Sequence, residues 1–252
     1  MILRSAALIL ILAASANAQT RDGRRPFEIA DNSFLVEEAF NQEAGVFQNI
    51  LLFQRPHGRE WTLEFTQEWP VFSQRHQFSF TVPLEAVKPP LAEDYDVARG
   101  TIGLNYRYQL TFEEGSGVAV SPRVSLLIPR ADEDLGVQFN LPVSKQFANV
   151  YAHANAGFTA DGDTRFHVAG SLIYRAWPMV HLMLESVYRI DEHDTLNGRE
   201  DGWLVSPGAR AGFNFGDQQL VVGAAVPIGL LNDYDTQDFI AYISWELPFM
   251  RR

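Results

Sequence analysis

Hydrophobic and polar residues alternate with a period of two along most of this chain. In the final stretch, "DFIAYISWELPF", every second residue from Phe239 to Phe249 is apolar, and the residues between them include Glu246. Successive side chains of a β-strand point to opposite faces, so this pattern predicts a strand with one apolar and one wetter face. Residues 59–69 and 101–112 show the same pattern strongly. We therefore predict that the protein is built mainly from two-faced strands.

The alternation recurs in segments of about ten residues, which is the length a tilted strand needs to cross a lipid bilayer. The twelve segments are residues 46–54, 59–69, 76–85, 101–112, 118–128, 135–144, 149–159, 165–176, 179–190, 203–215, 219–229 and 239–249. An even number of strands suits closure of an antiparallel barrel, and alternately short and longer connections are typical of outer-membrane barrels. We predict an all-β fold, a closed antiparallel transmembrane β-barrel of about 12 strands in residues 46–252.

A soluble periplasmic β-sandwich would also alternate, because one face of each sheet meets water and the other a core. That wet face should be rich in lysine, yet the chain contains only Lys88 and Lys145. Many aromatic residues also lie near segment ends, where outer-membrane barrels carry aromatic girdles. Those residues are Trp61, Trp69, Tyr174, Trp177, Tyr188, Trp203, Phe215 and Phe249. Both features favour the membrane barrel.

The first residues, "MILRSAALILILAASANAQ", predict a secretory signal peptide. Arg4 forms a short positive region, residues 6–14 an apolar region, and Ala16-Asn17-Ala18 a cleavage site. The apolar run is shorter than the roughly 20 residues of a spanning helix. We assign residues 1–18 to the signal peptide and residues 19–45 to an N-terminal periplasmic segment. The mature protein is expected in the outer membrane of a Gram-negative bacterium.

Composition and charge narrow the function. The formal net charge of −11 argues against a nucleic-acid partner, because phosphate binding requires clustered lysine or arginine. The chain has no cysteine, so disulfides cannot hold the fold and nothing suggests redox chemistry. We predict no cofactor, and we expect stability to come from packing and strand closure.

The stretch "DNSFLVEEAFNQEAG", residues 31–45, breaks the period of two just before the first strand. Asn32 or Ser33 is a suitable N-cap, carboxylates in the early turns suit the helix dipole, and Gly45 suits the end. We therefore predict a short helix. It would act either as a plug at the periplasmic mouth or as a linker on the barrel rim. The residues expected to form the plug helix are Phe34, Glu37, Glu38 and Phe40.

This stretch and the exported twelve-segment pattern resemble the outer-membrane β-barrel transporter family of the MetA pathway of phenol degradation. The resemblance covers most of the mature chain and is carried mainly by "NSFLVEEAFNQEAG" and by the overall layout. It implies a small barrel associated with the passage of small organic compounds, aromatic or hydrophobic ones among them. The resemblance assigns no functional residue.

The wetter faces of the strands predict the side chains of the lumen. They carry acidic and basic residues in similar numbers, so they form either a narrow, weakly selective conduit or a lumen filled by ion pairs. The predicted lumen-lining residues are Glu60, Glu64, Glu68, Arg107, Arg123, His153, His167, Arg175, His181, Glu185, Arg210, Tyr242 and Glu246.

A search for catalytic or metal-binding patterns gives no candidate. No histidine is followed two residues later by serine, and no G-x-S-x-G occurs, although a serine and a histidine from different strands could still meet. Pairing about residues 161–163 places His153 opposite Ser171 and about 13 Å from His167, too far for a shared ion. His181 falls near Tyr174 or Arg175 by the same reasoning. We predict that the protein has no metal site and is not an enzyme.

We conclude from the sequence that the protein is an outer-membrane channel for passive passage of small organic molecules. The alternatives are a structural or surface-interaction barrel with a closed, salt-bridged lumen and, less favoured, an outer-membrane enzyme. Expected partners are membrane lipid and lipopolysaccharide, the barrel-assembly machinery and the permeant; the pattern says nothing about the oligomeric state. The closing strand resembles the assembly signal of bacterial outer-membrane proteins, and the residues that carry it are Trp245, Leu247 and Phe249.

Overall fold

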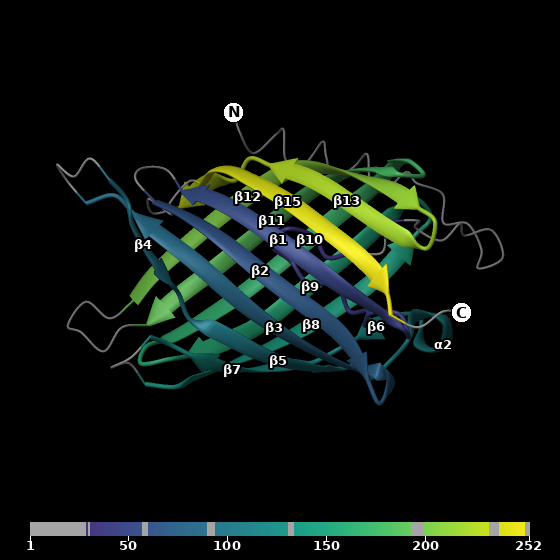
Figure 1. The fold of residues 1–252 in the computed structure, drawn as a ribbon, viewed down its shortest axis with the longest axis horizontal. Coiled ribbons are helices and arrows are strands. Elements are labelled where there is room, and N and C mark those ends of the chain that lie inside the picture. Colours follow the sequence, from purple (N-terminus) through teal and green to yellow (C-terminus); the bar gives the residue numbers. More distant parts are fainter. Residues whose placement is uncertain are drawn as a thin grey trace.

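The computed structural model of the chain describes residues 29, 31–56, 60–89, 94–130, 134–192, 199–231 and 237–249. These residues form a closed antiparallel β-barrel with strongly tilted strands (Figure 1). The predicted signal peptide, residues 1–18, lies outside the described residues. Within the described ranges, no helix is long and apolar enough to cross a membrane.

The strands are β1 (Val46–Pro56), β2 (Glu60–Val71), β3 (Ser73–Val87), β4 (Asp96–Arg99), β5 (Ile102–Tyr108), β6 (Ala119–Val120), β7 (Arg123–Ile128), β8 (Gly136–Phe147), β9 (Val150–Ala160), β10 (Thr164–Trp177), β11 (Val180–Glu192), β12 (Arg199–Phe215), β13 (Gln218–Ala225), β14 (Ile228–Leu231) and β15 (Gln237–Pro248). A short helix, α2 (Glu113–Ser116), lies between β5 and β6.

Three strands of the wall are each divided into two pieces. β4 and β5 both pair with β3, β6 and β7 both pair with β8, and β13 and β14 both pair with β12. Pro122 and Pro227 lie in two of the interruptions, where a missing backbone N–H breaks the ladder. Counting each divided strand once, the wall has twelve strands, so the predicted closed 12-strand barrel is confirmed.

The barrel closes between its first and last strands. β15 pairs with β1 in a register that places Ile50 opposite Ser244, and it pairs with β13 on its other side. The remaining wall strands each pair with their neighbours in the sequence, including β11 with β12. The stretch "DFIAYISWELPF" is therefore the closing strand, as its alternation predicted.

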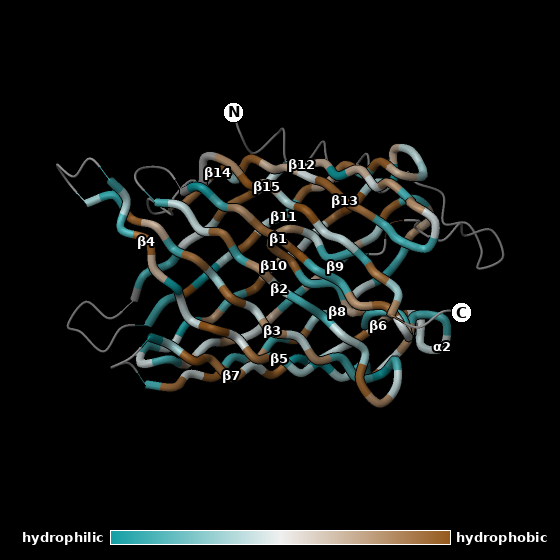
Figure 2. The backbone as a smooth tube through the Cα atoms, in the orientation of Figure 1, coloured by the Kyte–Doolittle hydropathy of each residue, from teal (hydrophilic) through white to brown (hydrophobic). Residues whose placement is uncertain are grey.

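The two faces of the wall separate as the period of two requires. Brown apolar and teal polar positions alternate along the strands (Figure 2). Large apolar side chains point outward, and Trp245 is 45% exposed although its neighbour Ser244 is fully buried in the lumen. Leu247 and Phe249 share the outer face with Trp245, so the three predicted assembly-signal residues face lipid; their role in assembly stays a prediction.

The barrel has a short-turn end and a long-loop end. At the short-turn end β2 meets β3 through Phe72, and residues 148–149, 178–179 and 216–217 form the other tight turns. Phe72 has a φ of 59°, which fits the abrupt reversal there. The C-terminus and α2 lie at this same end (Figure 1). Residues 161–163 join two strands at the opposite, long-loop end.

Candidate functional site: the barrel lumen

Residues 31–45, which we call the lumen segment, lie inside the barrel. Ile29 lies against Gly212 and Met179 near the short-turn end, and the segment contacts that end again where it joins β1 at Val46. Between these points it reaches strands on every side of the lumen. The predicted helix is wrong: residues 31–45 are all described, and they form bends, a turn and irregular backbone without a helix.

The wall replaces the hydrogen bonds that a helix would have made. The backbone N–H groups of Leu35 and Val36 both donate to Glu185 Oε1, at 2.7 and 3.1 Å. The N–H of Ala39 donates to Ser144 Oγ at 2.8 Å, and that of Gln42 donates to Gln77 Oε1 at 2.6 Å. Because these donors have partners outside the segment, the extended backbone carries no unsatisfied-donor penalty at these positions.

Two wall arginines bind the carbonyl groups of the segment. Arg210 Nη1 donates to the carbonyl oxygens of Asp31 and Asn32, at 2.6 and 2.7 Å. Arg107 donates to the carbonyl oxygens of Glu38 and Phe40, at 3.1 and 2.6 Å. Each arginine thus holds two peptide groups, and charge-assisted hydrogen bonds of this kind are stronger than neutral ones.

Asp31 anchors the start of the segment against the closing strand. Tyr242 Oη donates to its Oδ1 at 2.5 Å, and Gln48 Nε2 donates to the same oxygen at 2.8 Å. Burial raises the pKa of the Asp31 carboxyl, and the Arg210 guanidinium offsets only part of that rise. These contacts join the segment to both strands of the barrel seam.

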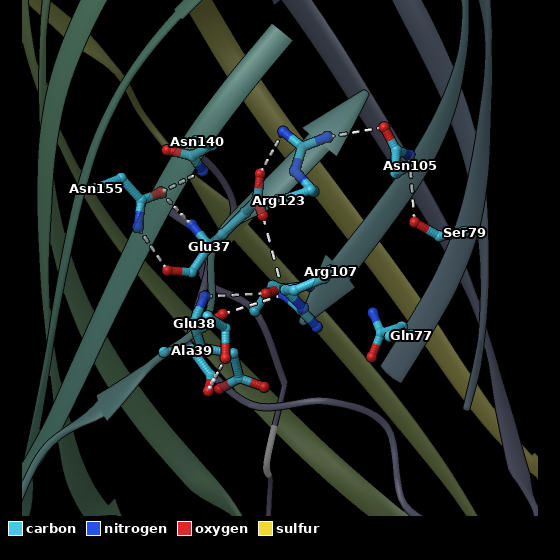
Figure 3. A network of polar contacts seen from close by, with 12 residues as sticks. Glu37, Glu38, Ala39, Gln77, Ser79, Asn105, Arg107, Arg123, Asn140 and Asn155 are labelled. Atoms are coloured by element: carbon cyan, nitrogen blue, oxygen red, sulfur yellow. Dashed lines mark hydrogen bonds and ion pairs between the residues drawn. The ribbon is translucent and has the colours of Figure 1, made fainter. Parts of the chain in front are cut away.

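Glu37 and Glu38 are neighbours with opposite electrostatic surroundings. Glu37 Oε1 lies 2.6 Å from Arg123 Nη2, and Glu37 Oε2 lies 3.9 Å from Arg107 Nη1 (Figure 3). Burial acts to raise the pKa of Glu37, but these two guanidinium groups outweigh it and hold the pKa below its ordinary value. Burial raises the pKa of Glu38 to about 8, because the nearby arginines compensate less and Asp31 and Glu68 add repulsion. Glu37 is therefore charged near neutral pH, whereas Glu38 is mostly protonated.

Apolar contacts seat the segment on one side of the lumen. Phe34 packs on Tyr242, with ring centroids 5.1 Å apart, and on the lumen face of Gly223. A Cβ at Gly223 would lie 2.4 Å from Phe34 Cζ, so the absence of a side chain there makes room for the ring. Phe34 belongs to a buried cluster that also contains Ile29, Ile50, Leu52, Ile173, Met183, Val221, Ala225, Ile240 and Tyr242.

A cavity of about 860 Å³ remains above the lumen segment. Asn32, Leu35 and Glu37 form part of its lining, so the segment is its floor. Asp161 and Asp191 also line it, and they lie at or near the long-loop ends of their strands, so the cavity runs from the segment toward that end. The space is about the size of a small-molecule site.

Most of the predicted lumen residues meet the segment or this cavity. The residues that hydrogen-bond or pair with the segment are Arg107, Arg123, Glu185, Arg210, Tyr242 and Glu246. Glu64, Glu68 and His167 line the cavity. Glu60 is exposed at the start of β2, and Arg175 binds Asn149 near the short-turn end, so neither lies in this group. Of the predicted plug residues, Phe34, Glu37 and Glu38 make the contacts above, and Phe40 packs on Tyr151 with ring centroids 5.3 Å apart.

The histidines lie where the predicted pairing placed them. His153 is opposite Ser171, and His181 is opposite Arg175. His153 Nδ1 lies 2.7 Å from Ser144 Oγ, so a serine and a histidine do meet across two strands. That serine accepts the Ala39 N–H, and His153 Nε2 has no hydrogen-bond partner among the described residues. The pair therefore lacks the third group that orients the base in serine hydrolases and contacts the lumen segment instead.

Sequence reasoning missed the apolar side of the lumen and the glycines that receive Phe34. Ile50 and Leu52 face inward, although apolar side chains in a barrel wall are expected to face lipid. The available signal was the alternation of β1 itself, in which Gln48 and Gln54 share a face with these two residues. Gly208 and Gly223 offered no such signal, because glycine fits either face of a strand.

Comparisons with known proteins show the fold. No family model matches the chain, and no curated protein matches it by sequence. Among solved structures, an outer-membrane channel from Pseudomonas putida F1 has a TM-score of 0.56 at 11% identity, over 82% of this chain and 97% of that one. NanC porin has a TM-score of 0.52 at 8% identity, over 78% and 98% of the two chains. KdgM porin has a TM-score of 0.51 at 8% identity, over 81% and 99%. With the apolar outer face, this shared fold indicates a bacterial outer-membrane barrel, as the sequence predicted.

Proposed function

We propose that the protein is an outer-membrane channel for small organic molecules and that its own lumen segment closes the channel in the state described above. The observation that carries the proposal is the way the lumen is filled. Wall side chains alone do not fill it, since a cavity of about 860 Å³ lies on one side of residues 31–45. The segment itself is held by side-chain hydrogen bonds, which can exchange with water, and it belongs to no strand ladder of the wall.

The class of permeant follows from the lining and from the resemblance noted in the sequence. The cavity is lined by polar side chains such as Asn105 and Gln138 and by apolar ones such as Leu52 and Phe166. A mixed lining suits small molecules with both polar and apolar parts. The names of the similar structures, two porins and a channel, support a channel role. The resemblance to the phenol-degradation transporter family supports small organic permeants.

A closed structural barrel is the second candidate, and one observation favours it. The lumen segment contacts β1, β3, β5, β8, β9, β10, β11, β12 and β15, so it braces most of the wall. In that case membrane lipid, lipopolysaccharide and the assembly machinery would be its partners, with no permeant. We infer no enzymatic role, because the cross-strand pair of Ser144 and His153 contacts the lumen segment.

Liposome swelling separates the two candidates. Purified protein is reconstituted and challenged with neutral, acidic and aromatic solutes of small size. The channel proposal predicts faster swelling for small organic solutes than in protein-free liposomes, and a further increase after removal of residues 19–44. Exclusion of every solute by both forms, each shown to be folded by heat-modifiable gel mobility, would support the closed structural barrel.

A further inference from the structure

We propose that Arg107 and Arg123 form a binding site for the carboxylate of a small organic monoacid, and that Glu37 occupies this site when the lumen segment is seated. The inference rests on the channel proposed above and names a class of ligand for it. Glu37 then acts as a built-in competitor, because its carboxylate and that of a ligand need the same guanidinium groups. The two arginines lie on β5 and β7, and the lumen segment presents Glu37 to them (Figure 3).

Arg123 is positioned by neutral groups and neutralised by Glu37. Its Nη1 donates to Asn105 Oδ1 at 2.8 Å and to Ser125 Oγ at 2.7 Å, and its Nη2 donates to Gln138 Oε1 at 2.7 Å. Its Nε is buried and has no hydrogen-bond partner among the described residues. The only carboxylate within ion-pair distance of Arg123 in the described parts of the chain is that of Glu37. Neutral wall side chains thus fix the plane of the Arg123 guanidinium, whereas its charge is balanced by Glu37, which belongs to the lumen segment and not to the wall.

Arg107 has a second carboxylate nearby, on the wall, besides that of Glu37. Its Nη2 lies 3.9 Å from Glu68 Oε2, on the wall, and its Nη1 lies 3.9 Å from Glu37 Oε2. Displacement of the Glu37 side chain, with the segment backbone still bound to Arg107, therefore costs Arg107 one of two weak ion pairs but costs Arg123 the carboxylate that pairs with it. An unpaired charge on a side chain as buried as that of Arg123 is unfavourable, so the empty site would favour another anion.

A ligand in the cavity can reach this ion pair. The Glu37 side chain is 27% exposed and that of Arg123 is 16% exposed, and both line the cavity that runs toward the long-loop end. Arg107 is 4% exposed and lines the same cavity from below. A solute entering past Asp161 and Asp191 would therefore meet the Glu37 and Arg123 pair at the floor.

The lining also limits the rest of the ligand. Ile50, Leu52 and Leu204 contribute apolar surface to the cavity, which suits an apolar body attached to the carboxylate. Glu64 and the two aspartates at the cavity mouth line it as well, and they would repel a ligand with several negative charges. A monocarboxylate with a compact hydrophobic part, such as benzoate, fits both requirements.

The test is a calorimetric titration of the full mature chain in detergent, with benzoate as the probe and benzamide as its neutral counterpart. Glu37→Gln keeps the size and the backbone contacts of residue 37 and removes the competing charge. We expect Glu37→Gln to tighten benzoate binding on the order of tenfold, because one charge-assisted contact of Arg123 becomes available to the ligand. Benzamide binding should not change. Adding Arg123→Gln to Glu37→Gln should abolish the gain. Arg123→Lys keeps the charge but loses the planar fork, so in the same background it should retain part of the gain.

Glu64→Gln is the matched control, because it removes another carboxylate from the same cavity. An equal gain from Glu64→Gln would reduce the effect to general electrostatics and overturn the site. Absence of benzoate binding to Glu37→Gln, or a gain that persists in full when Arg123→Gln is added, would overturn it too. Heat-modifiable gel mobility checks that each variant is folded. Since no membrane or current is involved, a failure here is separate from a failure of the channel proposal.

Discussion

At the scale of single residues, the lumen segment is held by small geometric fits as well as by charge. Gly223 leaves room for the Phe34 ring, and Tyr242 both packs against that ring and donates to Asp31. Arg210 and Arg107 bind peptide carbonyls, so they recognise the path of the segment's backbone. Substitutions at these positions should therefore weaken the binding of the lumen segment more than they weaken the barrel wall.

Gly223→Ala should loosen the segment, because the new methyl group would overlap the Phe34 ring. Overpacking of this kind costs about 1–3 kcal/mol, which corresponds to a rise of roughly 5- to 150-fold in the unseated population. The chain has no cysteine, so a single Val36→Cys change at a buried position of the segment reports seating. The rate of its modification by a water-soluble maleimide should rise in the Gly223→Ala background.

Gly103→Ala is the control for that substitution. Gly103 also lines the lumen, but a Cβ there would meet its nearest neighbour at 3.4 Å, an ordinary contact. An unchanged labelling rate in both backgrounds would show that Phe34 does not hold the segment.

Glu38 gives the seating of the segment a pH dependence. Residues 31–45 belong to no membrane-spanning strand, and burial raises the pKa of Glu38 from its ordinary 4.5 to about 8. The seated state therefore binds a proton more tightly than the released state. The stabilisation that protonated Glu38 gives to the seated state is complete below about pH 4.5 and is lost as the pH rises through about 8. Channel openings in planar bilayers should be more frequent at high pH, and Glu38→Gln should flatten the rise. A pH response that persists unchanged in Glu38→Gln would assign it to other groups.

At the scale of elements, the strands were predictable and the lumen segment was not. The period of two in β2, β5 and β15 survives because lipid and lumen impose different chemistry on the two faces of the wall. Residues 31–45 carry local helix signals, including a cap and early carboxylates. Inside the barrel those carboxylates and N–H groups find wall partners such as Arg123 and Glu185, and tertiary contacts override the local preference. One sequence alone does not reveal which wall residues will face the segment.

The closing strand carries the prediction at this scale. A chain cut before Trp245 loses four of the eleven residue pairs between β15 and β1, those of Trp245, Glu246, Leu247 and Pro248. Without that ladder the first strand keeps unpaired backbone groups in lipid, which is strongly unfavourable. The truncation should abolish membrane insertion, measured as loss of heat-modifiable gel mobility. A chain that ends at Phe249 is the control and should insert normally. Normal insertion of the shorter chain would show that the seam lies elsewhere.

At the scale of the whole molecule, the alternation predicted the barrel, the strand number and the closing strand. Each of these follows from the period of two, which arises because one face of the wall meets lipid and the other meets the lumen. The alternation proposes which side chains face the lumen, but it does not say what those side chains contact. Arg107, Arg123 and Arg210 were predicted only as lumen-lining residues, and the structure shows that all three bind the lumen segment. The apolar cluster around Phe34 was missed, because an inward apolar residue has meaning only once a segment of chain occupies the lumen.

Neutralising the three arginines together should therefore have two effects. Selectivity should move toward cations, because acidic side chains of the lumen remain. Conductance should also rise, because the carbonyl groups and Glu37 lose their partners. Reversal potentials in a salt gradient measure the first effect and open-channel current measures the second. A shift in selectivity with unchanged current would mean that the arginines do not hold the segment.

The most direct test of a channel closed by its own N-terminal segment is the planar-bilayer conductance of the intact protein and of the form lacking residues 19–44. In the deleted form Gly45 directly follows residue 18, the end of the predicted signal peptide, and β1 to β15 remain complete. We predict small, infrequent currents from the intact protein and a several-fold larger conductance with weak ion selectivity from the deleted form. Equal currents from both forms, or silence of both when gel mobility shows each to be folded, would contradict the account.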